Sequence, residues 1–562
     1  MTTHVTMNLD SELEHFRSHG VVSRDDIAAV TMFVEMARRD GAEQPMRLAC
    51  LAMCLAMRTV RDGHTCVDFN RIREWAAGLD LLGEDSSAWP TKVATWTKAL
   101  VAADRLVGPP GSRRPFILDG SRLYLGRSYD EESAIASTVH KRATQQRLQI
   151  LLGGPGTGKT TKVAHDLVAY FSSLPADAPP PRLALAAPTG KAAARMSEVL
   201  RQRCLDAGAS ETVLAAVTAE PARTVHKLLG YNPSRARRYT FHAGNPLPYD
   251  MVIVDEASML SSAFMHHLLV AVRPEALVRL VGDPDQLASV DAGTVLGDLA
   301  VFGNDALRQS PLHSCIETLT TIHRAEAAEI IALAAAIRDN ASHTAFEVLA
   351  SGSSAVAWVD PSDRSGLDDA VADVVAHAEA LRTAARRRSA AEVLTTKSQL
   401  QVLCAHRDGP MGVSGWNSRI EKRMAIPAGD PWYAGRPLMI TRNSRALGLA
   451  NGDVGVVVPQ GKRMEAIFGL PDDLTSVPVT RLEDVATVHA LTIHKSQGSE
   501  YDHAVIVLPE QPSRIVTREL LYTGVTRARR KVTVIGPRDV IEEAISTPIR
   551  RATGLAERLA DM

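Results

Sequence analysis

The chain has 562 residues, with 63 lysines and arginines against 64 aspartates and glutamates, so its formal net charge is −1. At roughly 150 residues per domain, this length predicts about three or four domains. The balanced charge excludes a protein drawn to nucleic acid or to a membrane by a global field, so any polyanion site must be a local groove. Aromatic residues make up only 4% of the chain, so any base-stacking platforms are few.

Several features predict a cytoplasmic protein that does not enter a membrane. The N-terminal stretch is polar and acidic, unlike a signal peptide. The longest apolar runs fall short of the roughly 20 residues that cross a bilayer. The cysteines are scattered, lack zinc-finger spacing and fit small buried hydrophobes in a reducing compartment: Cys50, Cys54, Cys66, Cys204, Cys315 and Cys404.

Residues 1–125 are predicted to form a mainly helical N-terminal domain. Its most apolar segment is "MRLACLAMCLAM", which offers more apolar surface than one helix can hide. We therefore expect this surface to face neighbours, either within its own domain or in a partner protein. "SRLYLGRSY" reads as a short strand, and the polar residues 126–147 read as a linker or helical connection.

The stretch "LLGGPGTGKTT" is the first motif along the chain that predicts a chemical function. A strand-like run ends in glycines, and Gly158-Lys159-Thr160 completes the phosphate-loop spacing. Glycines let backbone N–H groups approach phosphate oxygens, and the following helix would place its N-terminus on the phosphates. Lys159 is predicted to reach the β- and γ-phosphates, and the Thr160 hydroxyl to ligate Mg²⁺. The predicted nucleotide contacts are Gly153, Gly154, Pro155, Gly156, Thr157, Gly158, Lys159, Thr160 and Thr161.

Two further predicted strands end in polar residues that suit catalysis. "MVIVDEASML" predicts a buried strand that presents Asp255 to Mg²⁺ and Glu256 to the attacking water. "LVGDPDQLASVDAG" ends in a turn with Gln286, whose amide can both donate to and accept from a γ-phosphate. From residue 148 onward, short apolar strands alternate with helices, which predicts an α/β fold with parallel sheets. Residues 429–487 lose the helices and gain Gly, Pro and Val, so they predict a small β-rich insert, with Asn451-Gly452 as a hairpin turn.

With these motifs in order, the chain resembles superfamily 1 helicases. The later motifs are "TIHRAE", "IHKSQGSEYDHA" and "LLYTGVTRARRKV", and longer phrases such as "RLALAAPTGKAAARMSE", "RTVHKLLG" and "HAGNPLPYDMVIVDEASM" are similar to the RecD branch. The resemblance covers about residues 148–562. It implies two RecA-like domains, at 148–310 (with a hairpin insert near 230–246) and at 311–428 plus 488–562, and an SH3-like insert at 429–487.

The resemblance also implies the residue roles. ATP with Mg²⁺ would lie between the two RecA-like domains, with Lys159, Asp255, Glu256 and Gln286 on one side. Arg324 and Arg527 would reach the γ-phosphate from the other; Arg527 is preferred over Arg529 and Arg530 by motif match. DNA contacts are expected from Thr189, Lys191, Thr224, His226, His494, Lys495 and Ser496, with Glu500 linked toward the nucleotide. Arg235, Arg237 and Arg238 with Tyr239, Phe241 and His242 fit either a strand contact or an exposed hairpin.

The implied function is an ATP-dependent, 5′-to-3′ single-stranded DNA translocase, the motor of a heterotrimer with RecB-like and RecC-like subunits. It would act on duplex ends in double-strand-break repair and recombination, with the nuclease in a partner subunit. Residues 1–125 would dock that partner. The alternatives are a stand-alone RecD-like helicase and a nucleotide-dependent structural subunit. The chain departs from the family upstream of the phosphate loop, where Gln145 and Gln146 lie too near the loop to read adenine, so we expect weak base specificity.

Overall fold

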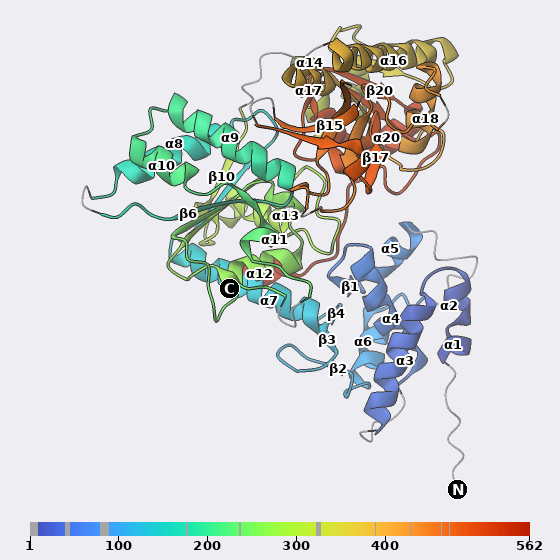
Figure 1. Ribbon diagram of the computed structural model, residues 1–562. Coiled ribbons are helices and arrows are strands. Elements are labelled where there is room, and N and C mark those ends of the chain that lie inside the picture. The colour runs from blue at the N-terminus through green and yellow to red at the C-terminus, as the bar shows by residue number, and fades with distance from the viewer. Residues whose placement is uncertain are drawn as a thin grey trace.

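The computed structural model describes residues 9–39, 45–78, 89–175, 178–234, 238–321, 328–387, 389–427, 429–444, 446–461, 463–470 and 473–562. Three bodies follow one another along the chain (Figure 1). They are a helical N-terminal region with a small sheet, an α/β body with a parallel sheet, and a second α/β body that carries an antiparallel sheet.

The N-terminal region packs six helices around one hydrophobic core and a four-stranded sheet of order β1-β4-β3-β2. The helices are α1 (Leu9–Glu12), α2 (Glu14–Ser18), α3 (Arg24–Arg39), α4 (Arg47–Arg61), α5 (Ile72–Gly78) and α6 (Val93–Val101). The strands are β1 (Cys66–Asp68), β2 (Val107–Gly108), β3 (Phe116–Asp119) and β4 (Arg122–Leu125), the last of which is the strand predicted from "SRLYL".

Helix α4 shows where most of the apolar surface of its segment is buried. Its apolar residues from Ala49 to Ala56 are all buried inside the N-terminal core. Residues 49–56 therefore find their neighbours within their own domain and offer no apolar surface to a partner, whereas Met46 at the start of the segment is 59% exposed.

The first parallel sheet has the strand order β10-β5-β9-β8-β6-β7. Its strands are β5 (Leu148–Gly153), β6 (Leu183–Ala187), β7 (Arg223–Thr224), β8 (Met251–Val254), β9 (Leu277–Gly282) and β10 (Ile316–Leu319). The strands that precede each motif are almost wholly buried, as a parallel sheet covered on both faces requires. Because β10 pairs with β5 from Ile316 to Leu319, the predicted boundary at residue 310 falls too early.

Helices cover this sheet on both faces (Figure 1). They are α8 (Lys159–Ser172), α9 (Gly190–Asp206), α10 (Glu211–Thr218), α11 (Val225–Leu228), α12 (Ser262–Ala271) and α13 (Val295–Ala300). The segment predicted as a linker or helical connection forms the helix α7 (Gly126–Thr144), whose buried Ile135, Ala136 and Val139 belong to the core of this body. The C-terminal helix α21 (Leu555–Ala560) also packs here, against α7, although residues 488–562 were all predicted to belong to the second body.

The second parallel sheet has the order β11-β20-β19-β12-β18. Its strands are β11 (Val356–Val359), β12 (Leu400–Cys404), β18 (Ala490–Thr492), β19 (Tyr501–Val507) and β20 (Ala528–Ile535). Its helices are α14 (Ala328–Arg338), α15 (Ser342–Leu349), α16 (Arg364–Arg387), α17 (Ala390–Gln399), α18 (Val413–Arg423), α19 (Arg518–Val525) and α20 (Arg538–Ser546).

The predicted β-rich insert is an antiparallel sheet of order β16-β15-β14-β13-β17. Its strands are β13 (Pro437–Ile440), β14 (Val454–Gln460), β15 (Arg463–Leu470), β16 (Asp473–Pro478) and β17 (Val485–Thr487). One face packs on α16 and α17 through Leu381, Val393 and Val456. Gly452 has a φ of 95° in the turn before β14, but Asn451-Gly452 ends a longer connection from β13 rather than forming a two-residue hairpin.

Across the described ranges, no helix is both long enough and apolar enough to cross a membrane. Within the described residues, none of the six cysteines forms a disulfide, and all except the half-buried Cys315 are buried.

Candidate active site

The phosphate loop connects β5 to α8, and its backbone leaves little room for side chains. Gly156 and Gly158 have φ values of 80° and 83°, in the left-handed region that favours glycine. A Cβ on Gly154 would lie 2.9 Å from the hydroxyl of Tyr522. Helix α8 begins at Lys159 without a side-chain cap at Gly158, so its first N–H groups face the loop. Thr157 is buried behind the loop, where it donates to the Gly154 carbonyl at 2.8 Å.

Lys159 folds back over this loop. Its Nζ donates to the carbonyl oxygens of Gly153, at 2.5 Å, and Gly154, at 3.0 Å. The ammonium thus lies at the carboxyl edge of the sheet, where ligands of parallel α/β folds bind. Thr160 and Thr161 line the same cavity from the first turn of α8.

Two carboxylates follow β8 in the same cavity. Burial and, second to it, the negative charge of the neighbouring Glu256 raise the pKa of Asp255 to about 6, against the opposing charges of Lys159 and Arg195. Glu256 has a φ of 52°, a strained value for a residue with a side chain, and its N–H donates to Asp255 Oδ1 at 2.9 Å. This strained turn aims the two carboxylates into the cavity instead of along the strand.

The loop after β9 joins the two bodies. Gln286 is 5% exposed and donates to Asp283 Oδ2 at 3.0 Å, and that oxygen also accepts the Tyr522 hydroxyl of α19 at 3.2 Å. The next residue, Leu287, packs in the core of the second body and donates its N–H to Thr523 Oγ1 at 3.0 Å. Gln286 therefore lies between the phosphate loop and the second body.

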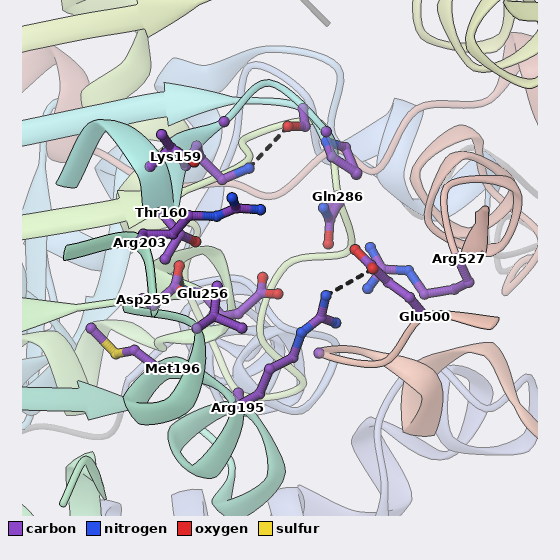
Figure 2. A pocket seen from close by; sticks show the side chains of 18 residues that line it. Lys159, Thr160, Arg195, Met196, Arg203, Asp255, Glu256, Gln286, Glu500 and Arg527 are labelled. Atoms are coloured by element: carbon purple, nitrogen blue, oxygen red, sulfur yellow. Dashed lines mark hydrogen bonds and ion pairs between the residues drawn. The ribbon is translucent and has the colours of Figure 1, made fainter. Parts of the chain in front are cut away.

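The second body closes the opposite side of this cavity. Arg527 is 3% exposed, and its guanidinium donates to the carbonyls of Thr523, at 3.0 Å, and Ser499, at 3.3 Å. Figure 2 shows Arg527 and Glu500 across the cavity from Lys159 and Asp255. Arg529, by contrast, is 44% exposed at its side chain and pairs with Glu500 at 3.4 Å, which favours Arg527 as the cavity-facing arginine.

The sequence analysis missed one contact that crosses the cleft. Arg195 of α9 donates to Glu500 at 2.7 Å, inside the same cavity (Figure 2). Arg203 of α9 lines it too. An arginine on an amphipathic helix carries no local signal of this role, and only the "HKSQGSE" context of Glu500 hinted at it.

The cavity has a volume of about 340 Å³, and its residues fit a nucleoside triphosphate with Mg²⁺. Cationic Lys159, Arg195 and Arg527 suit phosphate oxygens, and the Thr160 hydroxyl and the Asp255 carboxylate are oxygen ligands of the kind Mg²⁺ prefers. Arg324 lies outside the described residues. Gln145 and Gln146 are exposed and precede β5, so they lie at the amino end of that strand, away from the phosphate loop.

The predicted DNA contacts of the first body gather at the ends of two neighbouring strands. Ala187 of β6 pairs with Thr224 of β7, so the segments after both strands lie side by side. Thr189 caps α9 by accepting the Ala192 N–H at 3.2 Å, and Thr224 caps α11 by accepting the Lys227 N–H at 3.2 Å. These two helix N-termini supply partial positive charge at one edge of the sheet.

Lys191 and the second body meet at this edge. Lys191 is exposed, and its Nζ lies 6.0 Å from the centre of the Tyr501 ring. A Cβ on Gly498 would lie 3.3 Å from the Ala192 Cβ, so the segment after β18 reaches α9. His494 is half-buried, and burial lowers its pKa. Lys495 is exposed at the surface, but partial desolvation and the positive charge of Arg407 lower its pKa.

Ser496 requires a correction. It is 0% exposed, and its hydroxyl donates to the Ile493 carbonyl at 2.6 Å. It therefore holds the turn Ile493–Ser496 together, and it is withdrawn from the set of DNA contacts.

Three family descriptions match this chain. "RecBCD enzyme subunit RecD, N-terminal domain" matches residues 18–124, "AAA domain" matches 136–292, and "UvrD-like helicase C-terminal domain" matches 487–535. The Pif1 helicase structure from Candida albicans aligns with 76% of this chain and 98% of its own at 16% identity, with a TM-score of 0.39 that is too low to support a structural argument.

Curated relatives extend over most of the chain. The RecBCD enzyme subunit RecD of Mycolicibacterium smegmatis is 40% identical over 92% of this chain and 95% of its own, and that of Mycobacterium tuberculosis is 38% identical over 97% and 96%. The ATP-dependent RecD2 DNA helicase of Deinococcus radiodurans is 33% identical over 77% of this chain but only 53% of its own length. These near full-length matches establish that the chain belongs to the RecD family of RecBCD enzyme subunits.

Proposed function

We propose that this chain is an ATP-driven motor that moves 5′ to 3′ along single-stranded DNA, as the RecD-type subunit of a helicase–nuclease. The chain is a DNA helicase and DNA-dependent ATPase by its family relationship. The direction of movement and the residue roles below are our proposals.

The observation that carries this function is the single cavity that both α/β bodies line. Lys159, Asp255 and Gln286 enter it from the first body, and Glu500 and Arg527 from the second. A site divided in this way performs hydrolysis only when the cleft is closed, so each turnover is coupled to relative movement of the two bodies.

The chain's residues divide the chemistry between them. Bound ATP with Mg²⁺ would supply the γ-phosphoryl group and a divalent charge that offsets the charge of the phosphate oxygens. Lys159 and the α8 N-terminus hold the phosphates, while Thr160 and Asp255 hold the metal. Glu256 orients water, and Gln286 senses the γ-phosphate beside Tyr522 of the second body. Arg527 stabilises charge in the transition state, for which a planar guanidinium is well suited.

The single strand would lie over the carboxyl edges of both sheets. Thr189, Thr224 and their helix N-termini suit backbone phosphates, and Lys191 and Lys495 add exposed positive charge. Lys191 of the first body is positioned over Tyr501 of the second body. The proposed DNA contacts therefore lie where the two α/β bodies meet.

The N-terminal region is proposed to dock RecB-like and RecC-like subunits. Helix α4 is not available for this, but Met32 and Met36, one helical turn apart on α3, are 52% and 55% exposed, and Met46 is 59% exposed. Methionine side chains adapt to apolar partner surfaces. The described residues contain no disulfide, which supports a reducing compartment, and we place the assembly in the cytoplasm on duplex DNA ends in double-strand-break repair.

A streptavidin-displacement assay tests the proposal. The purified chain should hydrolyse ATP in response to single-stranded DNA and displace streptavidin from a 3′-biotinylated strand faster than from a 5′-biotinylated one. The Lys159→Gln variant should do neither. Displacement only from the 5′ end would reverse the direction, and hydrolysis without any displacement would favour a structural subunit. Loss of activity on separation from its native partners would argue against a stand-alone helicase.

A further inference from the structure

A row of aromatic rings crosses the surface of the first body, outside the nucleotide cavity. The ring centroids are 4.2 Å apart for His226 and Phe264, 5.3 Å for His226 and Tyr231, and 5.2 Å for Tyr231 and Tyr239. The row continues from Tyr239 to His267 at 4.3 Å and from His267 to His266 at 5.3 Å. We call these six residues the aromatic row.

The row is partly exposed and opens into two hollows. All six rings are half-buried. One hollow of about 370 Å³ is lined by row residues together with Arg127 and Arg238. A second of about 820 Å³ shares Arg127 and His267 with the first and extends to the loop 111–115 of the N-terminal region. Three histidines, two tyrosines and one phenylalanine thus keep part of each ring accessible along two adjoining hollows.

The charges around the row favour an anionic strand with flat faces. Burial lowers the pKa of His226, His266 and His267, so these rings are neutral near pH 7 and act as stacking surfaces. Positive charge comes from Arg127, Arg238, Arg113 and Arg114, all of which line the hollows. Asp130 and Glu131 also line the larger hollow, and Glu131 pairs with Arg127 at 2.7 Å.

One end of the row lies in the proposed DNA path. His226 belongs to α11, the short helix that Thr224 caps at the edge of the first sheet. The other end lies at the N-terminal region, whose loop contributes Arg113 and Arg114. The row therefore connects the strand path of the motor to the N-terminal region.

We propose that the aromatic row is a second single-stranded DNA site, on which unpaired bases stack as the strand passes between the motor cleft and the loop 111–115. Base–aromatic stacking combined with arginines along the backbone is the common chemistry of sequence-independent single-strand binding. This inference rests on the proposed function and adds to it an outer path for the strand, beyond the edge of the sheet.

The affinity of the full chain for oligothymidylates of two lengths tests the site. One is about 6 nucleotides long, near the lower end of single-strand site sizes, and the other about 20, beyond the upper end. A longer strand offers more positions at which the same protein site can bind, which by itself raises the apparent affinity. The wild type should bind the longer strand more tightly than this statistical effect explains. Tyr231→Ala or His267→Ala should reduce that affinity by about fivefold to a hundredfold, while binding of the short strand changes little. Tyr231→Phe should retain the affinity, because it retains the ring.

Matched controls distinguish the site from general damage. Tyr170→Ala removes another half-buried ring, which contacts Phe171 outside the row. The double variant Arg113→Ala, Arg114→Ala should lower the slope of log affinity against log salt by about 1.4, at roughly 0.7 per phosphate of a single strand. Arg308→Ala, which removes an exposed arginine paired with Asp305, should not change the slope.

The outcomes separate this inference from the proposed function. If the wild type fails to bind either strand, the motor assignment itself fails. If it binds the short strand but gains nothing with length, or if Tyr231→Ala and His267→Ala bind the long strand as the wild type does, the row is not a DNA site. Loss of a partner subunit from these variants with unchanged DNA affinity would overturn the proposal in favour of a protein interface.

Discussion

Replacing Arg527 by alanine should reduce turnover far more than nucleotide binding. The guanidinium is 3% exposed, and it donates to neutral oxygens, among them the carbonyls of Thr523 and Ser499. Because Arg527 also lines the cavity, its charge is available to the phosphate side. Supplying such an arginine is worth about 10³ to 10⁵ in kcat, which corresponds to about 4 to 7 kcal/mol of transition-state stabilisation.

The same change also removes structural hydrogen bonds. Arg527 donates to Thr523 O at 3.0 Å and to Ser499 O at 3.3 Å, and at about 1 kcal/mol for each bond the variant loses about 2 kcal/mol of stability. This loss is smaller than the 5 to 15 kcal/mol that typically holds a domain folded, so the variant should remain folded. Circular dichroism and thermal melting check this before any kinetic measurement.

The assay compares kcat for ATP hydrolysis with saturating single-stranded DNA against the Kd of a non-hydrolysable ATP analogue. Arg529→Ala is the matched control, since Arg529 forms an exposed ion pair with Glu500, and its kcat should change by less than about fivefold. If Arg527→Ala weakens analogue binding by the same factor as it lowers kcat, Arg527 is a ground-state contact and the reasoning is refuted.

Four further predictions follow from the same geometry. Lys159→Gln should abolish DNA-stimulated hydrolysis in a folded protein, and near-normal turnover would remove Lys159 from the phosphate site. GTP should support hydrolysis nearly as well as ATP, because Gln145 and Gln146 lie at the far end of β5; a kcat/KM preference above about a hundredfold, or about 2.7 kcal/mol, would show that another residue reads the base. A double-mutant cycle of Arg195→Ala and Glu500→Gln on analogue affinity should give a coupling of about 1 kcal/mol, and additive effects would exclude a cross-cleft role for the pair. Met32→Glu with Met36→Glu should reduce co-purification of partner subunits, whereas Val290→Glu, at a residue 81% exposed on the first body, should not; equal loss in both would point to general damage.

The sequence predicted the strands most accurately where a continuous apolar run ends in polar residues. Three strands lie directly before the phosphate loop, before Asp255 and before Asp283. They are buried on both faces, so their apolar composition alone identifies them as strands. The two parallel sheets and the antiparallel insert are confirmed. The individual site roles remain predictions, although the structure brings Lys159, Asp255 and Arg527 to one cavity.

The features that were missed depend on contacts between distant segments. Helix α7 looks like a linker because its polar residues outnumber Ile135, Ala136 and Val139, which pack only once the first body is assembled. Strand β10 joins the first sheet through pairing with β5, more than 160 residues earlier, and no local pattern records it. Ser496 matches a surface motif by spacing, but the turn that contains it is covered.

The return of α21 to the first body has a mechanical consequence. The second body is inserted into the first, since the chain enters it after β10 and leaves it after α20. Thr320, before the first crossing, lines one hollow together with Pro284, and Arg550 of the second crossing lines another hollow together with Pro284. Arg551 anchors the second crossing by donating to the carbonyls of Ser289 at 2.6 Å and Asp291 at 2.8 Å. A body attached by one chain crossing can rotate in any direction, whereas a body attached by two crossings rotates about the line that joins the two attachment points. We therefore expect the two chain crossings to fix the direction in which the second body rotates. Cutting one crossing alone would leave the two bodies joined by the other and would remove this restriction.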